Sequence, residues 1–226
     1  MSSNMIAYYV CVICAFVPAI VLHEVAHGFM AYKLGDPTAK NAGRLTLNPL
    51  AHIDPFGTVI LPLLLMVANA PVFGYAKPDP YNPLYFKDKR KGDLLVGLAG
   101  HGANLLLALL GAALAWAFLP MAKQSIPNEF FAYFYLCFLP YLTLINLYLM
   151  FFNLLPIPPL DGSSIFAFIL PEKYLPKYYS IQQYAMPVLM ICLFVIPYIL
   201  PINPISAYMN FFAGNIANAI FPFHIS

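Results

Sequence analysis

The residues best suited to chemistry in this chain are two histidines with a glutamate between them. The stretch His23-Glu24-Val25-Ala26-His27 puts two imidazoles four residues apart, so on an α-helix they lie one turn above the other on one face. Two imidazoles in this position can bind one zinc ion, and Glu24 can reach a water molecule on the metal. The spacing therefore predicts a hydrolytic zinc site with Glu24 as general base.

The three ionisable side chains lie within an apolar stretch, Ile6 to Tyr32. Ionisable groups in a membrane helix are costly to insert and by default mark a functional site. The alternative is a pair of histidines that only make hydrogen bonds between helices. That alternative needs a separate partner for all three polar groups and does not account for their spacing.

Asp161 is the candidate for a third metal ligand. A catalytic zinc site needs three protein ligands and leaves a fourth position for water. Asp161 follows the proline-rich segment Asn153 to Leu160 and precedes Gly162, and the prolines must end the preceding helix. A carboxylate there would be costly if free and stabilised if it bound a metal. An Asp-Gly turn at the membrane surface is the alternative.

The composition requires that these residues be positioned by membrane helices. Hydrophobic residues make up 62% of the 226 residues and charged residues 9%, against about 45–50% and about 25% in soluble domains. Runs that each reach about the 20 residues needed to span a bilayer are Ile6 to Tyr32, Leu94 to Leu119, Phe130 to Phe152 and Ile181 to Leu200. The formal charge of +2 falls in short loops and implies no nucleic-acid partner.

A shorter apolar stretch, Phe56 to Phe73, is interrupted by Pro62 and Pro71, and it could span the membrane or enter it and return. If it returns, ten of the eleven Lys and Arg share one side and only Lys123 lies opposite. The positive-inside rule favours this re-entrant arrangement, with the polar loops in the cytoplasm and the amino terminus outside. The ten residues are Lys33, Lys40, Arg44, Lys77, Lys87, Lys89, Arg90, Lys91, Lys173 and Lys177.

The depth of the ligands favours the same topology. The histidine pair lies in the second half of its helix, and Asp161 follows the end of another. The two helices must run in the same direction for the ligands to meet. A spanning Phe56 to Phe73 would reverse the second helix, whereas a re-entrant one brings both sites to the cytoplasmic half.

These residues resemble the site-2 protease family, in its compact bacterial or archaeal branch without PDZ or CBS domains. The resemblance covers Val21 to Gly162. The matching segments are His23 to His27, Asp36 to Pro49, Gly74 to Pro78, Gly100 to Asn104 and Asn153 to Gly162.

The resemblance implies an intramembrane zinc metalloprotease that hydrolyses peptide bonds within or near transmembrane segments of membrane proteins. Its one catalytic Zn²⁺ would be bound by His23, His27 and Asp161, with Glu24 as base. Its partners would be transmembrane protein or peptide substrates and the lipid bilayer of a prokaryotic plasma membrane. It also implies a re-entrant β-hairpin within Ala42 to Tyr75 that presents an edge to the substrate.

Four further polar residues receive weaker assignments. Asn153 is the family-supported candidate to contact the oxyanion or the substrate backbone; Asn104 could do the same or could hold helices together. His101 stands where the family usually has proline, and packing or hydrogen bonding is favoured over a role in substrate binding or proton transfer. His52 is expected to fix a loop, because the three-ligand set is already complete.

The predicted fold is an all-α polytopic membrane protein with five to six membrane helices and the re-entrant element after the first. We expect a single domain over 1–226, with a catalytic core at 6–165 and carboxyl-terminal helices at 180–223. Cys11 and Cys14 have the spacing of a redox or metal pair, but packing is the favoured interpretation.

Two other functions are compatible with the motif. A metal-ion or proton transporter could use His23, His27 and Asp161 as a transit site, and a non-catalytic scaffold could keep the motif for stability. A transporter predicts several ligand sets along a path. The sequence has one compact set beside a glutamate in the position of a base.

Overall fold

A computed structural model describes residues 3–60, 64, 77, 79–124, 128–158, 160–182, 184–199 and 203–225. These residues form helices and connecting segments, and none of them lies in a strand. The predicted all-α class is therefore confirmed for the described part of the chain. Most of the predicted re-entrant segment Phe56 to Phe73, and the second part of the range Ala42 to Tyr75 predicted to hold a β-hairpin, lie outside the described residues.

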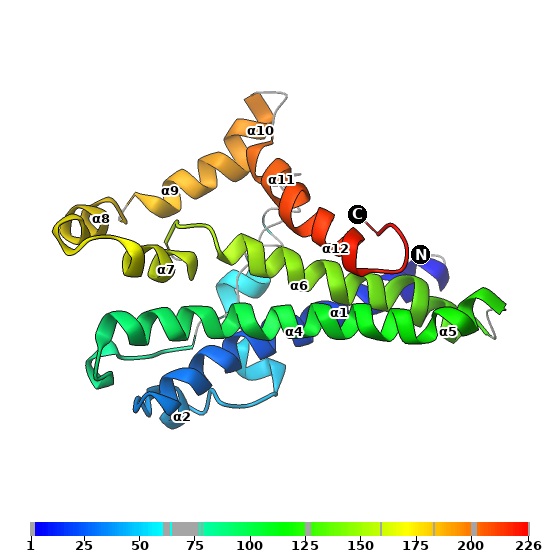
Figure 1. The fold of residues 1–226 in the computed structure, drawn as a ribbon, viewed down its shortest axis with the longest axis horizontal. Helices are drawn as coiled ribbons and strands as arrows, with labels where there is room; N and C mark the ends of the chain where they lie inside the picture. Colours follow the sequence, from blue (N-terminus) through cyan, green and yellow to red (C-terminus); the bar gives the residue numbers. More distant parts are fainter. Residues whose placement is uncertain are drawn as a thin grey trace.

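Three long helices form the body of the molecule (Figure 1). They are α1, Ser3–Lys33; α4, Lys89–Gln124; and a continuous helix made of α5, Glu129–Tyr133, the π-helical segment η4, Phe134–Phe138, and α6, Leu139–Asn153. Within the described residues, these three are long and apolar enough to cross a membrane. In Figure 1, α1 and α6 run in the same direction and α4 runs in the opposite one.

Small side chains let α4 pack closely against α1 and α6. Ala15 and Ala19 of α1 and Ala108 of α4 are fully buried. A Cβ atom at Gly111 of α4 would lie 2.6 Å from the Thr143 hydroxyl of α6. Close backbone approach through small residues is the usual way in which membrane helices associate.

Short elements follow the carboxyl end of α1. Gly35, with φ of +103°, adopts the left-handed conformation that commonly ends a helix. The chain then forms α2, Thr38–Asn41; η1, Pro49–His52; η2, Pro55–Ile60; and η3, Pro83–Tyr85. The Lys77 amide donates to the His52 carbonyl at 2.9 Å, so the residues on either side of 56–73 lie together.

Beyond α6 the chain turns back through α7, Gly162–Ile169, and forms a bent pair of helical arms (Figure 1). The first arm contains η5, Glu172–Tyr174; α8, Leu175–Gln182; α9, Ala185–Met190; η6, Ile191–Val195; and α10, Ile196–Ile199. The second contains α11, Pro204–Met209; η7, Asn210–Gly214; and α12, Asn215–Ile220. The predicted total of five to six membrane helices is not confirmed, because only the three helices above meet the length and hydropathy of a span in the described part of the chain.

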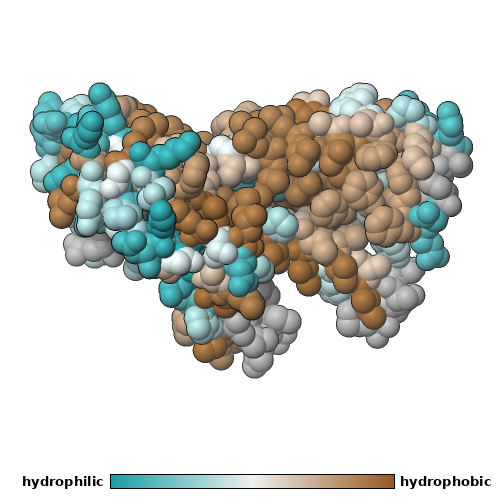
Figure 2. Space-filling model, turned by 90° about the horizontal axis from the view of Figure 1, so that it is seen from below, coloured by the Kyte–Doolittle hydropathy of each residue, from teal (hydrophilic) through white to brown (hydrophobic). Residues whose placement is uncertain are grey.

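Figure 2 shows how polar and apolar residues divide on one face of the molecule. Hydrophilic residues gather at the left end of this view, and a smaller group lies at the right edge. The surface between them is mostly hydrophobic. An apolar band between two polar ends is the surface expected of an integral membrane protein.

Candidate active site

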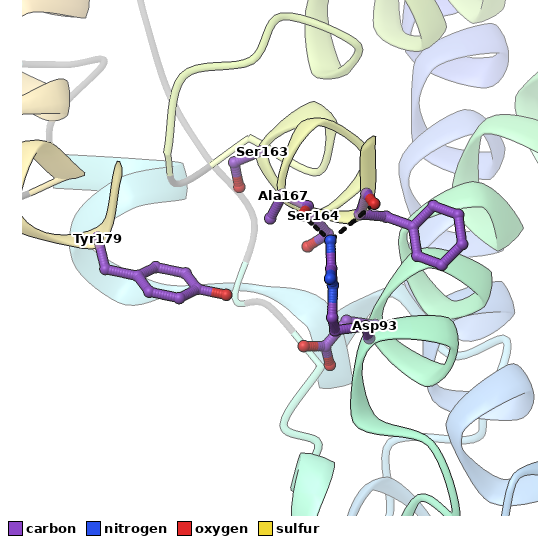
Figure 3. A pocket seen from close by; sticks show the side chains of 7 residues that line it. Asp93, Ser163, Ser164, Ala167 and Tyr179 are labelled. Carbon is purple, nitrogen blue, oxygen red and sulfur yellow. Dashed lines mark hydrogen bonds between the residues drawn. The ribbon is translucent and has the colours of Figure 1, made fainter. Parts of the chain in front are cut away.

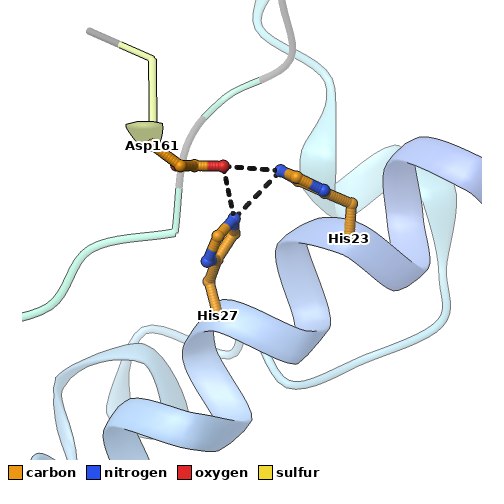
Figure 4. A group of neighbouring side chains, drawn as sticks. All are labelled: His23, His27 and Asp161. Atoms are coloured by element: carbon orange, nitrogen blue, oxygen red, sulfur yellow. Dashed lines mark hydrogen bonds and ion pairs between the residues drawn. The ribbon is translucent and has the colours of Figure 1, made fainter. Parts of the chain in front are cut away.

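The side chains of His23, His27 and Asp161 meet between α1 and the start of α7 (Figure 4). The Nε2 atoms of the two imidazoles are 2.9 Å apart, and each lies 3.1 Å from Asp161 Oδ2. Both histidines are buried. Ligands about 2.0 Å from a tetrahedral zinc ion are separated by about 3.3 Å, so the spacing of these three atoms is close to that of a zinc site.

Hydrogen bonds on the far side of each imidazole fix its tautomer. His23 Nδ1 lies 2.5 Å from the Asn104 side-chain oxygen, and His27 Nδ1 lies 2.7 Å from the Val96 carbonyl. Both partners are acceptors, so each Nδ1 carries the hydrogen and each Nε2 presents a lone pair. Two lone-pair nitrogens and a carboxylate oxygen then converge. They would repel one another without a cation, and the donor set fits zinc.

Asp161 reaches the histidines because the chain turns sharply between α6 and α7. Gly162 makes this turn possible, since a Cβ atom there would overlap the Leu154 backbone. At the other end of α7, Arg90 of α4 donates to the carbonyls of Ala167, Phe168 and Leu170 at 3.0, 2.8 and 2.7 Å. The helix that follows Asp161 is thus joined to α6 by a tight turn at one end and bound to α4 through Arg90 at the other.

Gly100 of α4 leaves the space that the imidazole pair occupies. A Cβ atom at this position would lie 2.6 Å from His23 Cε1 and would also overlap His27 Nε2. Gly100, the first of the two glycines in the Gly100 to Asn104 segment, therefore has a steric role at the site that the sequence did not reveal.

Glu24 lies on the same helical turn as the histidines. Its Oε2 accepts a hydrogen bond of 3.1 Å from the Asp79 main-chain amide. The Asp79 carboxylate is buried and paired with Arg44 at 2.9 Å. Burial raises the pKa of Asp79 to about 6, against the opposing effect of the Arg44 charge. Sequence reasoning missed Asp79, and its only signal was its position directly after the Gly74 to Pro78 segment.

The four residues with weaker assignments occupy different surroundings. The Asn104 side chain is fully buried and bonds to His23, Ala19 and Asn146, which favours the helix-holding interpretation. Asn153 ends α6 and is partly exposed.

The two remaining histidines are both buried. His101 Nδ1 lies 2.7 Å from the Gly97 carbonyl, and its ring centre is 6.2 Å from that of His23. His52 belongs to the loop around Asp79, where its Nδ1 lies 3.7 Å from Asp79 Oδ1.

A cavity of about 200 Å³ opens beside α7. Figure 3 shows Asp93, Ser163, Ser164 and Tyr179 around it. Arg90, Ala167 and Phe168 complete the lining. Because Ser163 and Ser164 follow Asp161 closely in the sequence, this polar cavity adjoins the element that carries the third candidate ligand.

Comparisons with known proteins agree with this chemistry. The model of Peptidase family M50 matches residues 119–196, a range that includes Asp161. No solved structure matches the chain.

Curated relatives match a larger part of the chain. YwhC of Bacillus subtilis, whose name describes a zinc metalloprotease, is 39% identical over 194 residues, which cover 84% of this chain and 80% of YwhC. Rip2 of Mycolicibacterium smegmatis, also named as a zinc metalloprotease, is 34% identical over 157 residues, or 70% of this chain and 56% of Rip2. Rip2 of Mycobacterium tuberculosis is 34% identical over 155 residues, or 68% of this chain and 55% of that protein. The resemblance found in the motifs is confirmed: the chain belongs to peptidase family M50, the membrane zinc metalloproteases of the site-2 protease type.

Proposed function

We propose that this protein hydrolyses peptide bonds within or near the transmembrane segments of other membrane proteins, with His23, His27 and Asp161 as zinc ligands and Glu24 as general base. The observation that carries the proposal is the convergence of three acceptor atoms within 3.1 Å of one another among helices long enough to span a bilayer. One bound zinc ion would satisfy all three acceptor atoms at once.

Glu24 and the histidines divide the chemistry between them. When bound, zinc would act as a Lewis acid and would lower the pKa of a water molecule at the site to about 7. Glu24 accepts the proton of the water that attacks the scissile carbonyl, and it then gives that proton to the leaving amine. Asn104 and the Val96 carbonyl keep the two Nε2 lone pairs directed at the metal position.

Asn153 is the candidate donor to the developing oxyanion or to the substrate backbone. It ends α6, just before the turn that leads to Asp161. Asn104 is the weaker candidate for this role, because its amide already bonds to Ala19 and Asn146.

The substrate is proposed to be a transmembrane segment that unwinds locally. A helix hides its carbonyls in its own hydrogen bonds, so segments with Gly, Pro or Asn should be preferred. A hairpin edge within Ala42 to Tyr75 would provide replacement hydrogen bonds.

The orientation is proposed to place the site on the cytoplasmic side, with water entering from the loops. The re-entrant course of Phe56 to Phe73 is supported by the bond between Lys77 and His52, which joins the two sides of that segment.

A transporter would need a series of ligand sets. Among the described residues, one group of three side chains could hold a metal, and a glutamate stands beside it. These facts favour the enzyme over a transport path.

The test uses purified protein in lipid vesicles with synthetic single-span peptides, each carrying Gly-Pro or Asn-Pro within an apolar segment. We expect wild type to cleave at that pair, and Glu24→Gln to keep zinc but lose cleavage, because glutamine cannot accept the proton.

His23→Ala, His27→Ala and Asp161→Ala should each lower the zinc content measured by mass spectrometry. Normal cleavage by Glu24→Gln would refute the base assignment. Zinc influx that persists in Glu24→Gln vesicles, without cleavage by wild type, would favour the transporter.

A further inference from the structure

The general-base candidate is held by the loop that precedes α4 and not only by its own helix. One oxygen of Glu24, Oε2, accepts the Asp79 amide at 3.1 Å. A carboxylate fixed through one oxygen has its other oxygen free for water. The position of residue 79 therefore determines which way the carboxylate turns.

Residue 79 is fixed by a buried ion pair. The Asp79 and Arg44 side chains are 1% and 6% exposed, and Arg44 Nε donates to Asp79 Oδ1 at 2.9 Å. The two remaining nitrogens of the guanidinium donate to the carbonyls of Ala51 and Lys77. One arginine thus ties together three points of the loop, with the planar multiple-donor geometry that lysine lacks.

His52 packs against the ion pair of Arg44 and Asp79, and these three residues are called the Arg44 cluster below. Its Nε2 lies 2.9 Å from the Thr46 carbonyl, and its Nδ1 lies 3.7 Å from Asp79 Oδ1. Its own carbonyl accepts the Lys77 amide at 2.9 Å. The Arg44 cluster therefore has few degrees of freedom.

Gly28 allows the Arg44 cluster to approach the catalytic helix. It lies four residues after Glu24 in α1, and a Cβ atom at this position would lie 2.5 Å from Asp79 Oδ2. A larger residue would push the loop away from the turn that carries Glu24. This close approach is needed for the Asp79 amide to reach the carboxylate.

We propose that Arg44 and Asp79 are positioning residues for Glu24: their ion pair sets the Asp79 amide that orients the carboxylate for proton transfer. The inference rests on the proposed role of Glu24 as base. It predicts that breaking the pair slows the chemical step without removing zinc or weakening substrate binding, because neither residue belongs to the ligand set.

The experiment measures kcat, KM, zinc content and melting temperature on a synthetic single-span peptide that wild type cleaves. Asp79→Asn and Arg44→Gln should each lower kcat by about 10- to 100-fold, the usual cost of losing a supporting contact. KM and zinc content should stay unchanged. Arg44→Lys should fall between Arg44→Gln and wild type. Lys91→Gln, which removes a charge from an exposed pair with Asp88, is the matched control and should retain the wild-type kcat.

The double variant Arg44→Gln with Asp79→Asn keeps the test decisive if a single change prevents folding. Removing one partner leaves an uncompensated buried charge, whereas neutralising both is far better tolerated. We expect the double variant to lose no more kcat than the worse single variant. Wild-type kcat in the double variant, or a fall in activity that only follows zinc loss, would overturn the proposal.

Glu24→Gln, assayed in parallel, distinguishes a failure of the proposed base role of Glu24 from a failure of the positioning role of Arg44 and Asp79. Normal cleavage by this variant would overturn both the base role and the positioning role. If Glu24→Gln is inactive while the Arg44 and Asp79 variants have normal kcat, only the positioning role fails.

Discussion

The orientation of each imidazole in the candidate zinc site depends on one hydrogen-bond acceptor, which contacts the ring nitrogen on the side away from the metal position. The Asn104 oxygen and the Val96 carbonyl accept from the two Nδ1 atoms at 2.5 and 2.7 Å. Both acceptors come from α4, so α4 orients ligands that α1 carries. The metal site is therefore sensitive to how closely these two helices pack.

Gly100→Ala tests how closely α4 must pack against α1, because it adds one methyl group between the two helices. The added Cβ would overlap both imidazoles, so we expect zinc affinity to fall by about 10- to 100-fold and cleavage to fall with it. The measurement is zinc retention against a graded series of chelator concentrations.

Gly102→Ala is the matched control on the same helix, since a Cβ atom there meets nothing within 4 Å. Both substitutions raise helix propensity by up to about 1 kcal/mol. Any difference in zinc retention between them thus comes from the overlap. Equal zinc retention by the two variants would show that the imidazoles can move aside.

The residue types of the site could be predicted from the sequence only where chemistry needs a particular side chain. His23, His27 and Asp161 could be predicted as candidate ligands because imidazole and carboxylate groups are rare in apolar segments, and the structure brings these three side chains together. The contacts of Glu24 with the Asp79 amide and of His27 with the Val96 carbonyl could not be predicted from the sequence. Every residue carries these backbone groups, and only the folded structure shows which of them lie next to the site. Gly100 was recognised within a motif, but its steric role needed the positions of the imidazoles.

At the scale of elements, α7 is the part that completes the site. It spans only Gly162–Ile169, too short for an isolated helix to be stable in water. Its attachment to α4 through Arg90 must therefore supply much of its order. The positive charge of Arg90 also lies at the carboxyl end of α7, where the helix dipole favours a cation.

Arg90→Gln should loosen α7 and so displace Asp161. We expect zinc to dissociate about 10-fold faster into excess chelator, while His23 and His27 keep their positions on α1. Lys91→Gln, one residue away on the exposed surface, is the control. Equal dissociation rates in the two variants would mean that the turn at Gly162 is sufficient to hold Asp161.

The long helices were predictable because length and hydropathy act over many residues. The predicted runs Ile6 to Tyr32 and Leu94 to Leu119 fall within α1 and α4. The run Ile181 to Leu200 was taken as one element, whereas α8 ends at Gln182 and α9 begins at Ala185. The sequence at this boundary contains the polar pair Gln182 and Gln183, but an average of hydropathy over about 20 residues does not register two polar residues at one end of a run.

At the scale of the whole molecule, the loops on either side of Phe56 to Phe73 form one structure. Arg44 joins Asp79 and Lys77, and Lys77 bonds to His52. This contact between the two flanking loops supports the proposal that the segment leaves and re-enters the same face of the bilayer. This contact is independent of the charge bias that first suggested re-entry.

The corresponding prediction concerns which face each loop occupies. In a variant whose four cysteines are replaced, Asn41→Cys and Lys87→Cys should each react with a membrane-impermeant thiol reagent only from the cytoplasmic side. Lys123→Cys should react only from the opposite side. All three positions are exposed, so differences in labelling report sidedness and not burial. If the first two cysteines labelled from opposite sides, Phe56 to Phe73 would have to span the membrane. The contacts between Arg44 and Asp79 could not then exist in the bilayer, and the route that brings Asp161 to the histidines would have to change.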